Sequence, residues 1–479
     1  MSEERKMKSM LKKSMLVASC AAAVSGVSVP VQAADWLMIQ GGERDDQAAR
    51  ARVWGFIQAQ YQKNNSTSNG GGGYIPPKLI GPDLDTQSAF NVNRARIGVR
   101  GTGMPLDSNV NYFFLVEFGN NAITNPGNSF AYITDASITL NHLKEFTRVR
   151  VGQFKVPMAE EIYQGIALFD YINFSDGINQ MLLERIPNRR SKSGNVSPQT
   201  LPVGTSLNTF NNPVAAARDV GIQFFNSIRV APSWEVGYSV MIANGNGINT
   251  SDNDNNKDTH LYFNLTKIYK GSGPRRQDWK TFAWYTKGKR TIDATFVDAN
   301  GDGIDDTYDP KVYDRKRFGV GTKYFKLPFR FSAEWFRGKG VIFQGPDKPN
   351  FGLGPAGSAT NPASTFSGLN PDARGTSWYV EGAYYIPKTR WELDMKYSSF
   401  NRMDNSTPVT LGPNVNVTPE IEFTDLTLGV QYHFNKKTRV AINLEKRDAE
   451  AVTWRAGVGP NANLDGVGNR YSIQLTHIF

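Results

Sequence analysis

Arginines recur at alternate positions in two segments of the chain, and their chemistry suggests an anion pathway. Arg94, Arg96 and Arg100 share one side of a run whose other side is apolar, and Arg148 and Arg150 repeat the pattern. A guanidinium stays charged at any working pH and binds the oxygens of phosphate-like anions with a two-donor fork. The same alternation predicts further cations on this side of the strands: Arg317, Lys323, Arg330, Arg439 and Arg470.

Carboxylates predicted on the same faces leave a second interpretation open. They are Glu117, Asp135, Glu235, Glu334, Glu381, Glu392 and Asp394. The arginines could instead pair with these carboxylates across the interior that the strands enclose. The sequence therefore allows either an anion-preferring wall or a wall of paired charges.

The predicted connection 157–217 is far longer than neighbouring strands need, so a function is expected of it. Its basic cluster, which would form a constriction opposite the wall arginines, is Arg185, Arg189, Arg190 and Lys192. It also carries the carboxylates Glu160, Glu161, Asp170, Asp176 and Glu184. Its Pro, Ser, Asn and Thr content is equally typical of a solvated outer loop.

An Asp-rich segment has the spacing of a calcium-binding loop. The candidate ligands are Asp298, Asn300, Asp302, Ile304, Asp306 and Asp309, with Ile304 at the position that binds through its backbone carbonyl. The segment lacks flanking helices and ends in Asp rather than Glu. Because Asn-Gly and Asp-Gly are also turn formers, a plain turn is the alternative. No other cofactor is expected.

An enzyme is not expected from the distribution of histidine. His142, His260, His433 and His477 fall on separate predicted strands or turns. None stands in a pattern with serine or carboxylate that nucleophilic catalysis requires. An adhesin or a purely structural barrel is a further, weaker alternative to a pore.

Residues 1–33 have the features of a secretory signal peptide, with a basic start, a short apolar run and a small-residue cleavage site after Ala33. Their removal takes away the single cysteine, Cys20, and leaves 49 basic and 42 acidic groups, a net charge of +7. No apolar stretch of about 18 residues follows, which excludes a helical membrane protein. Residues 34–50 are expected to form a short periplasmic segment, and 51–479 a transmembrane barrel.

Period-two alternation predicts the elements that must position these side chains. In 109–119, for example, Val110, Tyr112 and Phe114 share one face. We predict sixteen strands, each about ten residues long as a tilted bilayer span requires: 51–61, 90–101, 109–119, 130–140, 147–156, 218–228, 232–243, 259–269, 279–289, 314–325, 329–338, 376–386, 390–401, 423–434, 438–447 and 470–479.

The connections alternate in length, which indicates an all-β, antiparallel, closed barrel in an outer membrane. Every odd gap is long, including 62–89, 290–313 and 339–375, and every even gap is a tight turn, such as Lys326-Leu327-Pro328. Outer-membrane barrels sort their connections this way, with tight turns in the periplasm and loops outside. Closure also satisfies the strand edges that lipid could not.

The chain also resembles the phosphate-selective porins O and P. The resemblance depends on segments along most of the chain that include 94–101, 151–157, 184–185, 218–223, 244–247, 377–385 and 428–434, and the chain ends in an aromatic residue, Phe479, as outer-membrane barrels do. It implies a homotrimer of sixteen-stranded barrels, each with the third outer loop folded into the lumen. It also implies anions as solutes, with phosphate or related oxyanions as candidates, whereas a general diffusion porin is the alternative.

The location and partners follow from this assignment. We expect an integral protein of the bacterial outer membrane. Its expected partners are small inorganic anions, outer-membrane lipid with lipopolysaccharide, and the barrel-assembly machinery, but not nucleic acid.

Overall fold

The computed structural model describes the strands and parts of their connections. The described residues are 38, 50–65, 88–103, 107–121, 123–124, 130–184, 217–250, 252, 255–271, 276–297, 307–340, 342, 373–405, 408–410, 416–418, 420–453, 461 and 467–479. The predicted signal peptide 1–33 lies outside them, as do all of 34–50 except Met38 and Arg50.

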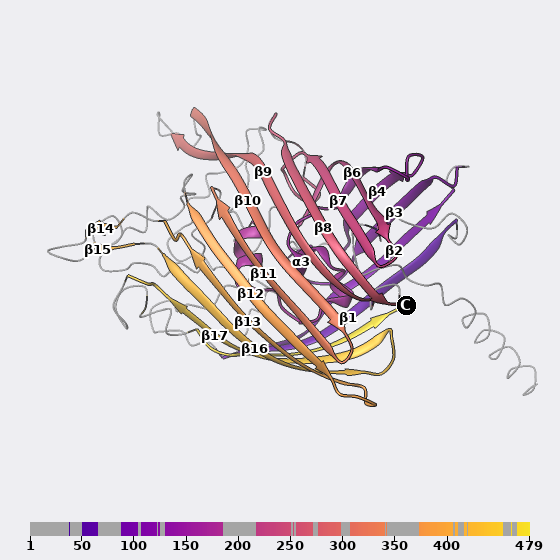
Figure 1. Cartoon of the computed structure of the whole chain (residues 1–479). Helices are drawn as coiled ribbons and strands as arrows, with labels where there is room; N and C mark the ends of the chain where they lie inside the picture. The colour runs from indigo at the N-terminus through magenta and orange to yellow at the C-terminus, as the bar shows by residue number, and fades with distance from the viewer. Residues whose placement is uncertain are drawn as a thin grey trace, which may run out of the picture.

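Sixteen strands of the described residues form one closed antiparallel barrel, as predicted (Figure 1). Each strand pairs with its neighbours along the chain, and β1 closes the barrel against β18. The strands are β1 Arg52–Asn64, β2 Ser88–Thr102, β3 Val110–Glu117, β4 Tyr132–Leu140, β5 Arg148–Lys155, β6 Arg218–Ala231, β7 Trp234–Ala243, β8 Asp258–Lys270, β9 Gln277–Val297, β10 Thr307–Lys326, β11 Phe329–Lys339, β12 Arg374–Tyr385, β13 Trp391–Arg402, β16 Ile421–His433, β17 Thr438–Glu450 and β18 Arg470–Ile478.

The predicted alternation of short and long connections is confirmed, with one boundary that was wrong. The gap 290–313 is mostly strand, because β9 continues to Val297 and β10 begins at Thr307. Residues 291–297 are rich in Thr, Ile, Phe and Val, which favour strands. This hairpin extends past its neighbours at the long-loop rim (Figure 1). A small hairpin, β14 Val409–Thr410 with β15 Asn416–Val417, lies in the connection before β16.

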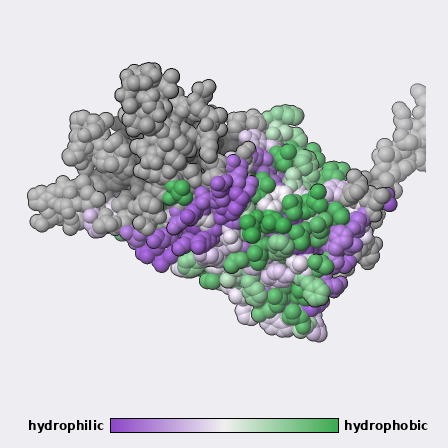
Figure 2. All heavy atoms as spheres, turned by 90° about the horizontal axis from the view of Figure 1, so that it is seen from above, coloured by the Kyte–Doolittle hydropathy of each residue, from purple (hydrophilic) through white to green (hydrophobic). Residues whose placement is uncertain are grey.

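Side chains alternate between an apolar outer face and a largely polar inner face. In β13, Trp391, Leu393 and Met395 are exposed on the outside, whereas Glu392 and Asp394 are buried. Figure 2 shows a hydrophobic area on the outer surface with hydrophilic residues at its borders. This pattern places lipid outside and polar groups within, as a barrel in a membrane requires.

Helical turns occur at the start of the third long connection. They are α3 Glu160–Tyr163, η1 Ile166–Leu168 and η2 Ile178–Leu182. Figure 1 shows α3 within the curve of the barrel wall. No helix of the described residues is long and apolar enough to cross a membrane.

Candidate permeation site

Residues 156–184, hereafter the inner loop, lie against inward-facing side chains of the barrel. Glu160 Oε2 is 2.5 Å from Lys280 Nζ of β9, and its other oxygen is 3.4 Å from Lys323 Nζ of β10. Asp170 lies 3.0 Å from Arg330 of β11. Burial would raise the pKa of Glu160, but the ammonium groups of Lys280 and Lys323 outweigh it and lower that pKa below its ordinary value. The contacts therefore hold Glu160 as a carboxylate.

Two more buried ion pairs fix the ends of the inner loop. Glu161 is 3.0 Å from Lys396 Nζ of β13, and both side chains are almost fully buried. Glu184 pairs with Arg315 of β10, whose guanidinium also lies 3.3 Å from Asp258 of β8. Four carboxylates of the inner loop, Glu160, Glu161, Asp170 and Glu184, thus each contact a wall cation.

Hydrogen bonds extend the contact surface of the inner loop to β1, β13 and β17. The amide nitrogen of Gln58 in β1 donates to the carbonyl of Ile166. The Tyr171 hydroxyl donates to the carbonyl of Met395 in β13, and the Ile172 N–H donates to Asn443 in β17. The inner loop thus spans the barrel interior from β1 to the strands opposite it.

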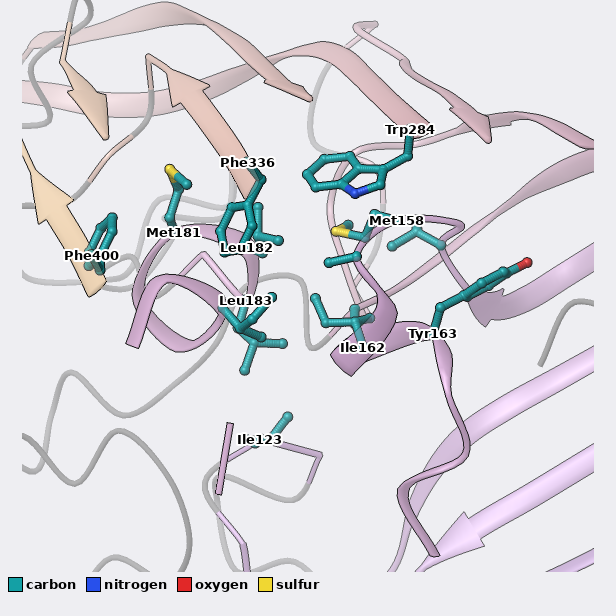
Figure 3. Close-up of a cluster of buried hydrophobic side chains, with 14 of the residues drawn as sticks. Ile123, Met158, Ile162, Tyr163, Met181, Leu182, Leu183, Trp284, Phe336 and Phe400 are labelled. Atoms are coloured by element: carbon teal, nitrogen blue, oxygen red, sulfur yellow. The ribbon is translucent and has the colours of Figure 1, made fainter. Parts of the chain in front are cut away.

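An apolar cluster packs the rest of the inner loop against the wall (Figure 3). Its loop members include Met158, Ile162, Tyr163, Met181, Leu182 and Leu183, and its wall members include Trp284, Phe336 and Phe400. Gly338 of β11 leaves the space that Met181 fills, because a Cβ at this position would lie 2.5 Å from the Met181 sulfur. The inner face of the barrel is thus partly apolar where the loop contacts it.

Glu334 of β11 connects the apolar cluster to α3. Its carboxylate accepts hydrogen bonds from Trp284 Nε1 at 2.7 Å, the Tyr379 hydroxyl at 2.8 Å and the Glu160 N–H at 2.9 Å. Three donors around one buried carboxylate fix the position of the first turn of the inner loop.

The arginines predicted on β2 face inward, but their partners differ. Arg96 pairs with Glu117 of β3 at 2.7 Å. Arg94 donates instead to the Gln58 amide oxygen at 3.0 Å. The register between β1 and β2 shifts after Gln58, and both Asn93 and Arg94 are buried there. Arg100 is half-buried, with its guanidinium over the Trp54 ring.

The arginines predicted on β5 are held by amides and aromatic rings. Arg150 donates to Gln223 of β6 at 2.9 Å, and its guanidinium lies 4.2 Å from the centroid of the Phe225 ring. Arg148 is hydrogen-bonded to Asn141 and Asn226. These contacts orient the guanidinium groups without supplying a negative charge.

The cations predicted on β10, β11 and β18 have different surroundings. Arg330 lies within 3.5 Å of wall carboxylates on β12 and β13, namely Glu381, Glu392 and Asp394. Arg470 of β18 pairs with Glu445. Arg317 donates to the backbone carbonyls of Lys316 and Lys339 at 2.9 Å. Pairing thus dominates on this side of the barrel.

Several cations of the site were not among the predicted residues. They include Lys280, Lys396, Arg315, Arg218 and Arg276. Lys396 follows Asp394 by two residues in the same strand, so the alternation already indicated its inward position. Arg218 and Arg276 pair with Asp135 and Glu235, which were predicted as wall carboxylates.

A cavity of about 100 Å³ opens at the short-turn rim beside the inner loop. We call it the rim cavity. Its lining contains seven lysines and arginines but only three carboxylates, which are Glu160, Asp170 and Asp278. Lys436 and Lys437 belong to the turn between β16 and β17, and Arg439 follows them. Arg276 and Arg330 of this lining also pair with carboxylates behind it, Glu235 for Arg276 and Glu381, Glu392 and Asp394 for Arg330. The excess of positive charge therefore lies at the turn that carries Lys436 and Lys437.

Two predicted groups lie outside the described residues. They are the constriction cations Arg185, Arg189, Arg190 and Lys192, and the calcium ligands Asp298, Asn300, Asp302, Ile304 and Asp306. The last candidate ligand, Asp309, is part of β10, where its backbone lies opposite Thr295.

A closed transmembrane barrel with charged groups along its interior defines an outer-membrane channel protein. A family model described as Gram-negative porin matches residues 14–451, and the chain belongs to this family. Family and fold indicate a channel rather than an enzyme, located in the outer membrane.

Solved structures show the same fold. The anion-selective porin from Comamonas acidovorans is 13% identical, with a TM-score of 0.50 over 90% of this chain and 100% of that one. OmpF of Salmonella typhi in complex with daunomycin is 12% identical, with a TM-score of 0.50 over 90% of this chain and 97% of that one. No curated protein matches the chain in sequence.

Proposed function

We propose that this porin is a passive diffusion channel that prefers anions. The observation that carries the proposal is the pair of lysines in the lining of the rim cavity, Lys436 and Lys437, which no ion pair of the described residues joins to a carboxylate. Arg94 and Arg150, which bind amide oxygens, add positive charge inside the barrel. At an ionic strength of about 0.1 M such charges act over about 10 Å, so they concentrate anions at the mouth and repel cations.

The proposed solutes are phosphate or related oxyanions. Two features support this class: the resemblance to the phosphate-selective porins O and P, and the arginines beside the rim cavity, whose forked donors fit tetrahedral oxyanions. The same resemblance supports a homotrimer, which chemical cross-linking of the purified protein would test.

Reversal potentials in a potassium chloride gradient test the anion preference. We expect the anion-selective sign for the wild type and a shift toward cations for Lys436→Gln/Lys437→Gln. Both lysines lie in an exposed turn, so the barrel should fold normally. Lys388→Gln removes a charge from the exposed turn between β12 and β13, outside the rim cavity, and should leave the potential unchanged. A cation-selective wild type contradicts the proposal.

A general diffusion channel is the second candidate, and the pairing of wall charges favours it. Arg330, Lys396 and Arg470 each lie beside at least one carboxylate, which cancels their field. If this candidate is correct, the wild type shows little selectivity and the double variant at Lys436 and Lys437 does not differ from it.

Calcium binding by 298–309 stays a prediction. Calcium at millimolar concentration should protect the tip of the β9–β10 hairpin from proteolysis, compared with a chelator. Equal cleavage in both conditions supports the plain turn.

A further inference from the structure

Four cations form a row across the outer face of β9, β10, β11 and β12. Lys316 lies directly opposite Lys287 on one side and Lys339 on the other, and Lys339 lies opposite Arg374. The three lysines are exposed on the outside of the barrel, and Arg374 is half-exposed. Because neighbouring strands lie about 4.8 Å apart, the row spans about 15 Å. We call Lys287, Lys316, Lys339 and Arg374 the cationic row.

The cationic row lies where the apolar band of the outer face ends. On β11, ten residues separate Lys339 from the exposed Phe329 at the short-turn end. Ten residues of a strand tilted by about 40° rise about 25 Å along the barrel axis, which is the height of the apolar band of such barrels. Trp335 and Phe318 form an aromatic contact just below the row. Aromatic side chains are typical of the membrane interface.

Like charges directly opposite one another destabilise an antiparallel sheet. Two carboxylates lie near this row. Asp404 is 2.6 Å from Arg374 and 3.7 Å from Arg337. Asp314 is exposed on the same face of β10 as Lys316, but it lies directly opposite another exposed lysine, Lys289. Within the same part of the chain, no ion pair joins Lys287 or Lys316 to a carboxylate. The row therefore has a local excess of positive charge at the level of the lipid headgroups.

The outer rim of β16 and β17 has the opposite charge. Glu422 lies opposite Glu450, and Asp448 lies one rung away. Lys446 stands nearby on the same face, opposite Leu426. The charge at this rim thus differs between the strand pair β16–β17 and the strands β9–β12, so the positive excess of the row is not shared by every strand of the rim.

We infer that the cationic row is a docking surface for the phosphate groups of outer-leaflet glycolipid. Charge complementarity and depth select this occupant, since the row faces lipid and lies at the long-loop rim, which is outside the cell in porins. A lipid with two phosphates places its anions between adjacent lysines and relieves their repulsion. The acyl chains then lie along the apolar band below.

Binding of bisphosphorylated lipid A to the purified protein in mixed micelles tests this inference. The triple variant Lys287→Gln/Lys316→Gln/Lys339→Gln should bind it more weakly, by roughly fivefold for each lysine removed. Lys316→Gln alone should lose roughly fivefold and tests the inference if the triple variant fails to fold. Lys446→Gln is its matched control and should bind like the wild type.

Two further probes separate lipid-borne phosphate from other ligands. Lipid A without phosphate should bind the wild type no better than it binds the triple variant. Inorganic phosphate at the same concentration should not displace bisphosphorylated lipid A, because it lacks the acyl chains. Equal binding of lipid A by the wild type and Lys316→Gln overturns the inference, and so does displacement by inorganic phosphate.

Discussion

In β2 and β5, Arg94 and Arg150 are held by the amide oxygens of Gln58 and Gln223, whereas in β11 Arg330 lies among carboxylates. We call β1–β7 the N-terminal wall and β9–β18 the C-terminal wall. An amide orients a guanidinium and leaves its charge in place, but a carboxylate cancels that charge. Arg94 and Arg150 of the N-terminal wall therefore keep their charge, whereas carboxylates cancel much of the positive charge of the C-terminal wall, which contacts the inner loop and lines most of the rim cavity.

The division between the two walls is not complete. Arg96 and Arg218 of the N-terminal wall pair with Glu117 and Asp135. In the C-terminal wall, Arg439 donates to the Gln431 amide oxygen at 2.8 Å. The two walls thus differ in degree in how far carboxylates pair with their cations. Substitutions that remove single charges can measure this difference.

The largest loss of folding stability is expected when Arg330 is replaced. Arg330→Gln leaves Glu381, Glu392 and Asp394 buried together without their shared cation, which should cost about 3–5 kcal/mol of stability. Arg94→Gln, the counterpart in the N-terminal wall, should cost less, about 1.5 kcal/mol, because one hydrogen bond between a guanidinium and a neutral amide is lost and no carboxylate loses an ion-pair partner. Urea unfolding of the barrel in micelles compares the two, and equal losses would contradict the distinction between the walls.

The next effect concerns the docking of the inner loop. Lys396→Met leaves Glu161 without its cation, but undocking of the loop can rehydrate that carboxylate, so we expect a smaller cost of about 2 kcal/mol. Single-channel conductance should rise, and proteolysis of 156–184 should accelerate. Adding Glu161→Gln to Lys396→Met should restore part of the loss. A double variant as impaired as Lys396→Met would show that the pair does not hold the loop.

Ion selectivity provides a third comparison. Arg94→Gln removes a charge that no ion pair of the described residues joins to a carboxylate, so the reversal potential should shift measurably toward cations. Arg96→Gln/Glu117→Gln removes one charge of each sign on the same strand pair and should leave the potential close to that of the wild type. If the double variant shifts the reversal potential as far as Arg94→Gln does, pairing with Glu117 does not cancel the effect of the Arg96 charge on ion selectivity.

The strands were predictable because period-two alternation and turn residues are local properties of the chain. All sixteen follow from them, and the main difference is the longer β9–β10 hairpin. Its Thr-rich extension lies beyond the apolar band, where alternation no longer separates lipid from lumen. A prediction based on a bilayer span therefore ended these strands too early.

The partners within the barrel were only partly predictable. Alternation places Arg94 and Arg96 on the inner face, but it does not tell that one meets Gln58 and the other Glu117. These partners depend on the register shift between β1 and β2, which no pattern in the sequence predicts. The carboxylates of 160–184 are plain in the sequence, yet their pairing with Lys280 and Lys396 depends on contacts across more than a hundred residues.

The smallest effect is expected from acidification at Glu160, where Lys280 and Lys323 lower the pKa of a buried carboxylate. A depressed folded-state pKa contributes stability that is fully present above the ordinary glutamate value of about 4.3 and is lost as the pH falls through the folded value. Protease resistance of 156–184 should therefore differ between the wild type and Glu160→Gln at neutral pH, and the difference should shrink below about pH 4. Carboxylates that do not lie beside residue 160 titrate equally in both proteins, so the difference reports on Glu160 and its immediate surroundings. A constant difference down to strong acid would show that the charge of Glu160 does not cause it. No difference at neutral pH would mean that apolar packing around Met181 and Ile162, which does not depend on pH, retains the inner loop by itself.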